Sequence, residues 1–424
     1  MTDPSPRLRS DIDIIPTTYR GERSLMIKDS LGLIPEPVLL QAAGIALIRL
    51  IDGIRTLRDI QLEFMRQNNN VFIGMDVVEG MVAELDRAML LDSPRYREAQ
   101  AALVNEYRSL ETREPHLAGR AYPEDAKELR AFLNDLLPPP ADSALSSAAP
   151  SPAPPPPAVH ALVAPHIDLS VGRRVYAQAY RAVQGNKPPL VIFLGTGHAL
   201  QGHFFSVSEK NFASPLGEIA NARPWAQAVK AAGGKAVSPD DFIHRSEHSL
   251  EFQLLFCQHL FGGGFSLLPI LCGSFHDLLN SVSRPSEIPE IDRVIRALRQ
   301  VLEEEPGTLI IAGVDFSHIG RKFGHGVSAA ALLAEAKAHD SALITALRHA
   351  DIGGFWEEGR RVQDRYNVCG FSTLACLLEI LPDSEGHLLD YEFWREEPTQ
   401  SAVSFAAVIL TGPAGKTAAG ERDG

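Results

Sequence analysis

The sequence predicts an α/β fold for most of the chain, with a mainly parallel central sheet covered by helices, preceded by a small N-terminal domain of short helices. Three observations support this prediction. Between residues 159 and 412, strand-like and helix-like segments alternate. The strand-like segments are continuous apolar runs, which are typical of strands buried on both faces. The first 96 residues carry short segments with helical spacing instead.

Composition restricts the class of protein. The chain has 424 residues, enough for two or three domains, and 45% of them are apolar. Four cysteines without CxxC spacing argue against a zinc knuckle or a disulfide framework and favour a reducing cytoplasm. The N-terminus has no apolar signal segment, and Gln41 and Arg49 interrupt the apolar stretch 37–51, so we expect no membrane span. The net charge of −13 argues against a nucleic-acid partner.

The N-terminal 96 residues predict a winged-helix domain. In chain order, we expect a helix over 37–51, a turn at Asp52-Gly53, a second helix opening over Thr56–Ile60, a third helix over Asp76–Ala88 that Asp76 caps, and a closing apolar run at Met89–Leu91. Short helices that are separated by a turn and close on an apolar segment are typical of this arrangement.

Two motifs of this domain carry a family resemblance. The segments LIDGIRTLRDI and DVVEGMVAELDRAMLLD resemble the PqqD-like winged helix found beside radical-SAM peptide-modifying systems. The resemblance implies a domain that binds a peptide, a radical-SAM protein or both. Its net charge is negative, whereas a DNA-binding face must be basic to neutralise phosphates. A packing or dimerisation domain is the alternative.

Three further segments complete the organisation. Residues 97–112 read as a polar connecting helix, and residues 113–412 as one α/β domain. The Pro-, Ala- and Ser-rich segment 138–157 cannot bury apolar surface, so we expect a mobile, partly extended insertion within that domain. Residues 413–424 are expected to form a disordered tail.

The α/β domain contains five clear strand candidates and five clear helix candidates. The strands are expected at Ala161–Ala164, Leu190–Leu194, Phe265–Leu271, Thr308–Val314 and Val403–Leu410, and the helices at Val175–Val183, Leu250–Leu260, Glu287–Leu302, Val327–Leu347 and Phe371–Leu381.

Polar side chains gather where these strands end. His166 and Asp168 follow the first strand, His198 follows the second, and Asp315 and His318 follow the fourth. In doubly wound sheets, ligands bind outside the carboxyl ends of the strands. Three strands therefore deliver imidazole or carboxylate groups to one edge of the sheet.

Two helix starts join this group. Glu247, His248 and Glu251 open one helix, while Cys369 and Gly370 precede another. The helix dipole should favour a thiolate at Cys369, and Gly370 permits the close approach of a ligand. The other three cysteines, Cys257, Cys272 and Cys376, are expected to be inert residues of the core.

Structural roles compete with these functional ones. A single buried histidine more often hydrogen-bonds within the core than binds a ligand, and we expect this of His203, His259, His276, His325, His339, His349 and His387. His248 either caps or bridges its helix, or it contacts a metal ligand without binding the metal itself. Asp168 either orients His166, caps a turn or ligates a metal.

The ordered motifs resemble the MEMO family, whose prokaryotic members are called AmmeMemoRadiSam system protein B. The motifs are Pro165-His166, Gly195-x-x-His198, Glu247-His248-Ser249, Asp315-Phe316-Ser317-His318, Cys369-Gly370 and Ser401-x-x-Ser404; an Ala-Gly-x-x-Tyr pattern near residue 120 also matches. The resemblance implies a fold similar to class III extradiol dioxygenases. It also implies a metal triad of His166, His198 and Cys369, with His318 as the catalytic histidine beside Asp315.

This sequence departs from the family pattern near two of the ligands. Asp168 lies where many members carry glycine, and Ala199 replaces the second histidine of a pair. Relative to the two-histidine, one-carboxylate site of a dioxygenase, the thiolate keeps one negative charge and softens the site. We therefore expect iron or copper, with zinc as an alternative.

Three functions follow from these residues. The first is a metal-dependent, dioxygenase-like redox enzyme, in which His318 is the general acid or base, Asp315 orients it and His248 lines the pocket. The second is a peptide-binding or scaffold protein with a vestigial metal site. The third is a cysteine hydrolase with Cys369 as nucleophile and His318 as base, which requires hydrogen-bonding distance and an oxyanion hole.

Overall fold

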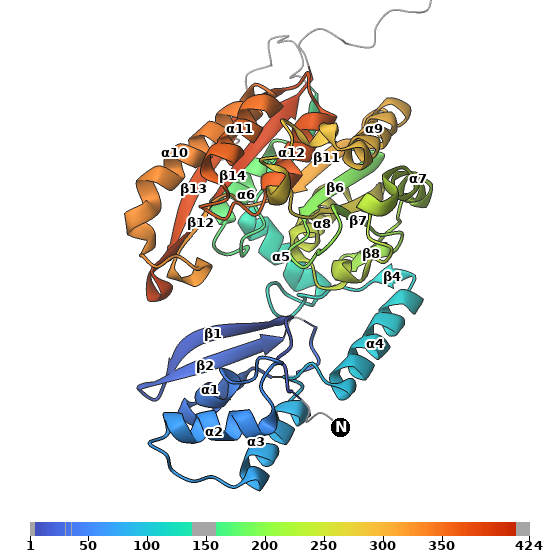
Figure 1. Cartoon of the computed structure of the whole chain (residues 1–424). Helices are drawn as coiled ribbons and strands as arrows, with labels where there is room; N and C mark the ends of the chain where they lie inside the picture. The colour runs from blue at the N-terminus through green and yellow to red at the C-terminus, as the bar shows by residue number, and fades with distance from the viewer. Residues whose placement is uncertain (1–4, 30, 35, 138–157, 413–424) are drawn as a thin grey trace, which may run out of the picture. The chain divides into compact units, whose positions relative to one another are not determined.

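The computed structural model describes residues 5–29, 31–34, 36–137 and 158–412. The chain forms two compact units, residues 1–109 and 110–424 (Figure 1). The predicted insertion 138–157 and tail 413–424 lie outside the described residues.

The smaller unit combines a three-stranded antiparallel sheet with helices. Its elements are β1 (Ile12–Tyr19), β2 (Glu22–Asp29), β3 (Val38–Leu40), α1 (Ala42–Ile48), α2 (Leu57–Gln67), α3 (Met75–Arg87) and α4 (Pro94–Ser109). β1 and β2 form a hairpin whose two-residue turn, Arg20-Gly21, has positive φ at both positions. Ile27 of the sheet packs with Ile60, Phe64 and Val78 of the helices in one apolar core.

The structure corrects three details of the prediction for this unit. The N-terminal hairpin was not predicted. The expected helix over 37–51 is instead the short strand β3 followed by the shorter helix α1. The third helix begins after Gly74, so Asp76 lies in its first turn and does not cap it. By contrast, α2 begins where the sequence predicted a helix start, and Thr56 and Asp59 form a reciprocal capping box there.

The larger unit is built around one mixed sheet, with strand order β12-β14-β5-β11-β6-β10-β7 and β13 paired to β14. The four central strands β5, β11, β6 and β10 are parallel, which confirms the largely parallel sheet, and the flanking strands are antiparallel. The bounds are β5 (Val159–Ala164), β6 (Leu190–Thr196), β7 (Phe205–Val207), β10 (Ser266–Cys272), β11 (Leu309–Gly313), β12 (His318–Gly320), β13 (Glu385–Glu396) and β14 (Ser401–Thr411).

Helices cover both faces of this sheet (Figure 1). Side chains alternate along β6, so that Val191 and Phe193 pack with one helical layer, while Ile192 and Leu194 pack with the other. The first layer contains α5 (Ala126–Leu136), α6 (Arg173–Arg181) and α8 (His248–Phe261), and the second contains α7 (Arg223–Gly233), α9 (Pro289–Glu304), α10 (Ala329–Arg348), α11 (Ile352–Val362) and α12 (Phe371–Ile380).

A second, small sheet of the larger unit joins β4 (Thr112–Arg113), β8 (Asn211–Ser214) and β9 (Gly217–Ile219). In the described part of the chain, no helix is both long enough and apolar enough to cross a bilayer. The four parallel strands place the carboxyl ends of β5, β6, β10 and β11 along one edge of the main sheet, where the candidate residues lie.

Candidate metal centre

His166 is held firmly at the end of β5. Its Nδ1 lies 3.0 Å from the carbonyl oxygen of Gly313. A carbonyl can only accept a hydrogen bond, so Nδ1 carries the proton and Nε2 keeps its lone pair. The backbone N–H of His166 donates to Asp315 at 2.9 Å, and the residue is only 2% exposed. Burial holds the pKa of His166 well below its usual value, which favours the neutral ring that a metal ligand requires.

His198, after β6, is fixed by the carboxylate of Glu247. The Nδ1 atom of His198 lies 3.1 Å from both carboxylate oxygens, and its backbone N–H donates to Oε2 at 3.2 Å. The carboxylate accepts the Nδ1 proton, which again leaves the lone pair on Nε2. Burial disfavours the charged ring, yet the negative charge of Glu247 and its hydrogen bond raise the pKa of His198 well above the usual value, so Nε2 also binds a proton, which a metal ion would displace to use this lone pair.

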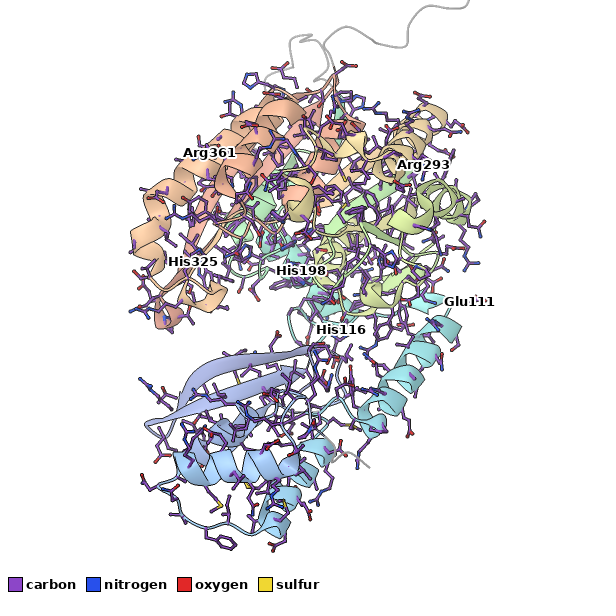
Figure 2. All side chains as sticks on the ribbon, in the orientation of Figure 1. Glu111, His116, His198, Arg293, His325 and Arg361 are labelled. Carbon is purple, nitrogen blue, oxygen red and sulfur yellow. The ribbon has the colours of Figure 1, made fainter. Side chains whose placement is uncertain are left out.

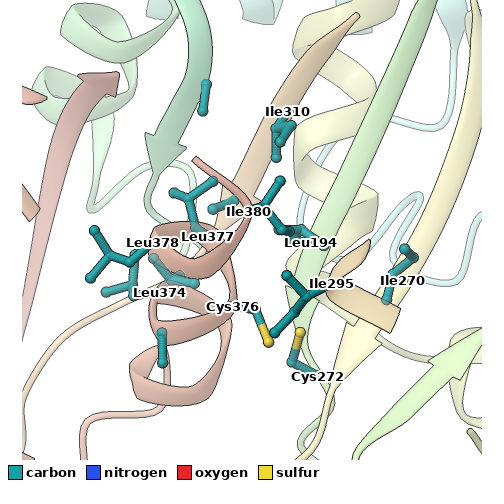
Figure 3. Close-up of a cluster of buried hydrophobic side chains, with 14 of the residues drawn as sticks. Leu194, Ile270, Cys272, Ile295, Ile310, Leu374, Cys376, Leu377, Leu378 and Ile380 are labelled. Carbon is teal, nitrogen blue, oxygen red and sulfur yellow. The ribbon is translucent and has the colours of Figure 1, made fainter. Parts of the chain in front are cut away.

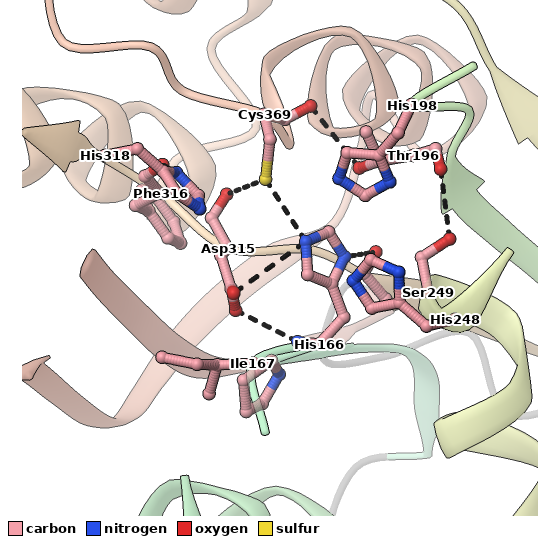
Figure 4. Close-up of polar contacts among 12 residues, drawn as sticks. His166, Ile167, Thr196, His198, His248, Ser249, Asp315, Phe316, His318 and Cys369 are labelled. Carbon is pink, nitrogen blue, oxygen red and sulfur yellow. Dashed lines mark hydrogen bonds and ion pairs between the residues drawn. The ribbon is translucent and has the colours of Figure 1, made fainter. Parts of the chain in front are cut away.

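Cys369 brings its sulfur to the same point from the loop before α12. Its Sγ lies 3.3 Å from Nε2 of His166 and 3.5 Å from the carbonyl oxygen of Asp315 (Figure 4), and within 4.8 Å of a ring nitrogen of His198. Burial raises the pKa of this thiol, against our expectation that the helix dipole would favour the thiolate. A nearby cation is therefore needed to hold Cys369 as a thiolate.

These three side chains form a group suited to a metal ion. Their ligand atoms all lie within 4.8 Å of one another. A second group, His198, Glu247 and His248, also meets that distance. However, Glu247 already accepts hydrogen bonds from His198 and from the backbone N–H of Ser249, at 3.0 Å for the latter. Glu247 therefore holds the ring of a ligand by a hydrogen bond and is not itself a ligand. The better ligand set is His166, His198 and Cys369.

His248 lies beside this triad at the start of α8. Its ring stacks on that of His198, with 4.9 Å between the ring centroids, and lies 5.0 Å from that of His166. Its Nδ1 is 3.3 Å from Glu247. His248 thus shares the supporting carboxylate of His198 and faces the same space.

Asp315 contacts His166 and not, as expected, His318. Its Oδ1 accepts the backbone N–H of His166, and its Oδ2 lies 3.7 Å from Nε2 of that ring. Burial raises the pKa of Asp315 to about 7. Its position suits a group that orients the first metal ligand.

His318 is positioned by backbone atoms. Its Nδ1 lies 3.0 Å from the carbonyl oxygen of Phe316 and 3.2 Å from that of Asn367, so the proton is on Nδ1 and Nε2 keeps its lone pair. Burial lowers the pKa of this ring to about 4. Asn367 has a left-handed backbone (φ 48°), and its side chain donates to the carbonyls of His318 and Phe323 at 3.1 and 3.2 Å.

All of these groups line one cavity of about 910 Å³. The polar floor comprises His166, His198, His248, Asp315, His318 and Cys369, while apolar walls are supplied by Leu117, Ile167, Val171, Phe252, Phe323 and Trp394. The size and the mixed lining are typical of a small-molecule site. Histidines outside the cavity, such as His325, lie well apart from His198 (Figure 2).

Comparisons with known proteins identify the family of this chain. A profile described as Memo-like protein matches residues 113–409, most of the chain. The chain belongs to the Memo-like family. A MEMO1 family protein of Aquifex aeolicus is 28% identical over 393 residues, covering 91% of this chain and 95% of that protein. One from Thermus thermophilus is also 28% identical, covering 84% and 99%, and one from Methanopyrus kandleri is 29% identical, covering 66% and 91%.

The relatives differ in how much of the N-terminal unit their matches include. An alignment over 91% of the chain cannot fit within the Memo-like unit alone, so the Aquifex protein also matches much of the N-terminal unit. The Methanopyrus protein is nearly covered by a match that spans 66% of this chain. No comparison identifies the N-terminal unit itself.

The structure decides among the roles expected for Asp168 and changes the role expected for Gly370. The Oδ1 atom of Asp168 accepts the backbone N–H of Ser170 at 2.8 Å, so this carboxylate caps a turn and belongs to neither metal group of the described residues. A Cβ on Gly370 would lie 2.6 Å from Val314 Cβ and 2.7 Å from the Asp315 carbonyl. Gly370 therefore permits close packing against the end of β11, and not the approach of a ligand.

Other residues gain roles that the sequence did not predict. His276, expected to be structural, lines the cavity and lies 3.1 Å from Asp364. Ser404, the second serine of the Ser401-x-x-Ser404 motif, donates a hydrogen bond to the buried Asp340 at 2.6 Å. Asp340 also accepts one from Ser317, which precedes His318, at 2.6 Å. These contacts tie β14 and α10 to the segment that carries His318.

Glu251 holds the first residues of the Memo-like unit, 113–122, in place beside α8. This buried carboxylate accepts hydrogen bonds from the backbone of His116 and Leu117 at 3.1 and 2.7 Å, and from the hydroxyl of Tyr122. It also pairs with Arg113, whose Nε donates to the carbonyl of His244. The tyrosine of the Ala-Gly-x-x-Tyr pattern thus fixes the segment that supplies Leu117 to the cavity wall.

Proposed function

We propose that this Memo-like protein is a metal-dependent redox enzyme acting on a small molecule, with His166, His198 and Cys369 holding one ion of iron or copper. The observation that carries the proposal is the convergence of three ligand atoms within 4.8 Å on the floor of a cavity. Two imidazoles and one thiolate suit iron, copper and zinc. When bound, iron or copper would supply one-electron redox chemistry.

The surrounding residues complete such a site. Gly313 and Glu247 each hold one Nδ1 proton, so that both ligand imidazoles direct a lone pair to the same point. His318 presents an unprotonated Nε2 to the cavity and is suited to accept a proton from a bound substrate. Apolar walls exclude water from one side of the substrate.

The third function, a cysteine hydrolase, has less support. The imidazole nearest Cys369 is that of His166, at 3.3 Å, and not the expected base His318. Burial also holds the pKa of His166 well below its usual value, which disfavours transfer of the thiol proton to this ring. The raised pKa of Cys369 also disfavours a free thiolate nucleophile.

Elemental analysis of anaerobically purified protein tests the metal assignment. We expect near-stoichiometric iron or copper, and its loss in the double variant His166→Ala/His198→Ala. His349→Ala, at an exposed position, is the control and should keep the metal. Full metal content in the double variant would overturn the proposal. A purified protein that contains only zinc would contradict the redox chemistry that we propose.

A second candidate function concerns the N-terminal unit. We propose that it is a PqqD-like winged helix that binds a peptide or a radical-SAM partner in a reducing cytoplasm. If the protein is only a scaffold of this kind, its metal site is vestigial. Its support is a group of apolar side chains left exposed on the described surface of this unit: Ile54, Leu62, Val71 and Phe72, at 81, 58, 62 and 76%. A docking surface of this unit would use such exposed apolar side chains.

Binding measurements test this docking role. A radical-SAM protein or short peptide encoded next to this gene should bind the full chain. The variant Val71→Ser/Phe72→Ser should bind it several-fold more weakly, since each exposed apolar side chain contributes about 1 kcal/mol or more when buried. Unchanged binding by this variant and by a chain lacking residues 1–96 would contradict the docking role.

A further inference from the structure

Two cysteines outside the metal triad face each other across the core of the Memo-like unit. Cys272 ends β10, and Cys376 lies in the middle of α12. Their sulfur atoms point toward each other (Figure 3). The pair therefore joins two segments that are more than a hundred residues apart in the sequence.

The surroundings hold this pair in place. Cys272 and Cys376 are 2% and 1% exposed, and the apolar side chains of Leu194, Ile270 and Ile295 pack around them (Figure 3). The backbone of Cys272 is fixed by strand pairing on both sides, to β6 and to β7. Cys376 is fixed by its helix. Neither sulfur can move far from the other in the folded protein.

The pair also adjoins the metal cavity. Cys272 borders that cavity, and its carbonyl accepts the backbone N–H of Gly197, next to His198, at 2.8 Å. Cys376 belongs to the helix that begins directly after Cys369 and Gly370. A covalent link between the two cysteines would therefore join the helix that follows Cys369 to the strand end that hydrogen-bonds the residue before His198.

We propose that Cys272 and Cys376 form an oxidisable thiol pair, which a small peroxide converts into a disulfide. The sulfur of Cys272, which borders the cavity, attacks one peroxide oxygen. The O–O bond breaks, one water leaves, and a sulfenic acid remains. The sulfur of Cys376 then attacks Cys272, the S–O bond breaks, and the S–S bond forms with release of a second water. Two thiols lose two electrons, which reduce one hydrogen peroxide to two waters.

Peptide mapping of the folded, full-length protein tests this pair. The protein is treated with hydrogen peroxide, trapped with iodoacetamide and digested with chymotrypsin without reductant. This protease separates the cysteines, because Phe261 and Phe265 lie between Cys257 and Cys272, and Phe371 lies between Cys369 and Cys376. We expect a Cys272–Cys376 peptide that dithiothreitol resolves, and the loss of two of the four alkylatable thiols.

Matched variants define the result. Cys272→Ser and Cys376→Ser should each abolish the cross-link, while Cys257→Ser, in the other core of the sheet, should keep it. Cys369→Ser should also keep it, so the outcome does not depend on the metal assignment. A cross-link that forms only in denaturant, or a wild-type protein in which peroxide modifies only Cys369, would overturn the proposal. The wild-type map decides even where a variant fails to fold.

Discussion

At the residue scale, the metal triad depends on proton positions that fixed acceptors dictate. His166 donates to a strand carbonyl and His198 to a carboxylate, in both cases through Nδ1, so Nε2 is the nitrogen that each ring can offer to a metal ion. The sequence placed these three residues at strand ends and a helix start of one sheet edge, and the family resemblance implied that they form a triad; the structure brings their ligand atoms within 4.8 Å of one another. The sequence could not predict these acceptors, because Gly313 and Glu247 reach the rings only once strands and helix have packed.

Cys369 gives the sharpest test of the triad. In the metal-loaded protein, its thiolate is held by the ion, and we expect iodoacetamide to alkylate it slowly until a chelator removes the ion. Alkylation should then be faster, although limited by the raised pKa of the thiol. Rates are followed by mass spectrometry with and without chelator. Rapid labelling of the metal-loaded form would contradict the ligand assignment and favour a free nucleophile.

Asn367 is expected to position His318. In Asn367→Gly, the left-handed backbone remains accessible, but the side-chain bonds to the carbonyls of His318 and Phe323 are lost. In Asn367→Ala, the backbone also becomes strained by about 1 kcal/mol. Nitrogen-15 NMR of the histidine rings should show one His318 tautomer in the wild type and a mixture in both variants. Identical spectra, with unchanged metal content, would show that Asn367 does not position this ring.

At the element scale, continuous apolar runs were reliable and alternating ones were not. β5, β6, β10 and β11 lie within a few residues of their predicted bounds, because strands buried on both faces are apolar throughout. β13 was missed because most of it is half-buried, and it alternates polar with apolar residues. The hairpin β1–β2 was missed because its turn, Arg20-Gly21, lacks the usual Asn-Gly or Asp-Gly signal.

The anchoring of residues 113–122 onto α8 can be measured. Glu251→Ala should lower the free energy of unfolding by about 3–5 kcal/mol, since it leaves Arg113 buried without its carboxylate partner. Tyr122→Phe should cost only about 2 kcal/mol, because Glu251 keeps Arg113 and two backbone donors. Denaturant titrations give both values. Equal losses in the two variants would place the stabilisation in the tyrosine bond and not in the ion pair.

At the scale of the whole molecule, buried neutral histidines predict a loss of stability in acid. His244 is 1% exposed, and burial lowers its pKa from 6.5 to about 4. Since the unfolded chain binds the proton more tightly, the stabilisation is complete above pH 6.5 and declines as the pH falls toward 4. His244 alone should account for about 2 kcal/mol between pH 7.5 and 5.

Thermal unfolding at several pH values tests this contribution. His244→Phe removes the titrating group and should flatten the decline of Tm with acid by that amount. Exposed His349→Gln is the matched control and should leave the slope unchanged. A slope in His244→Phe that matches the wild type would assign the acid sensitivity to other buried histidines, such as His166.

The three proposed metal ligands come from distant parts of the chain, and this constrains when the centre can form. His166 and Cys369 are 203 residues apart, and β5 and β6, which carry the two histidines, are not neighbours but flank β11. A nascent chain released before residue 369 lacks the sulfur, and one without β11 cannot align the histidines. Such long-range pairings form late and slowly. The protein would therefore bind the ion only after synthesis and folding of the larger unit are complete.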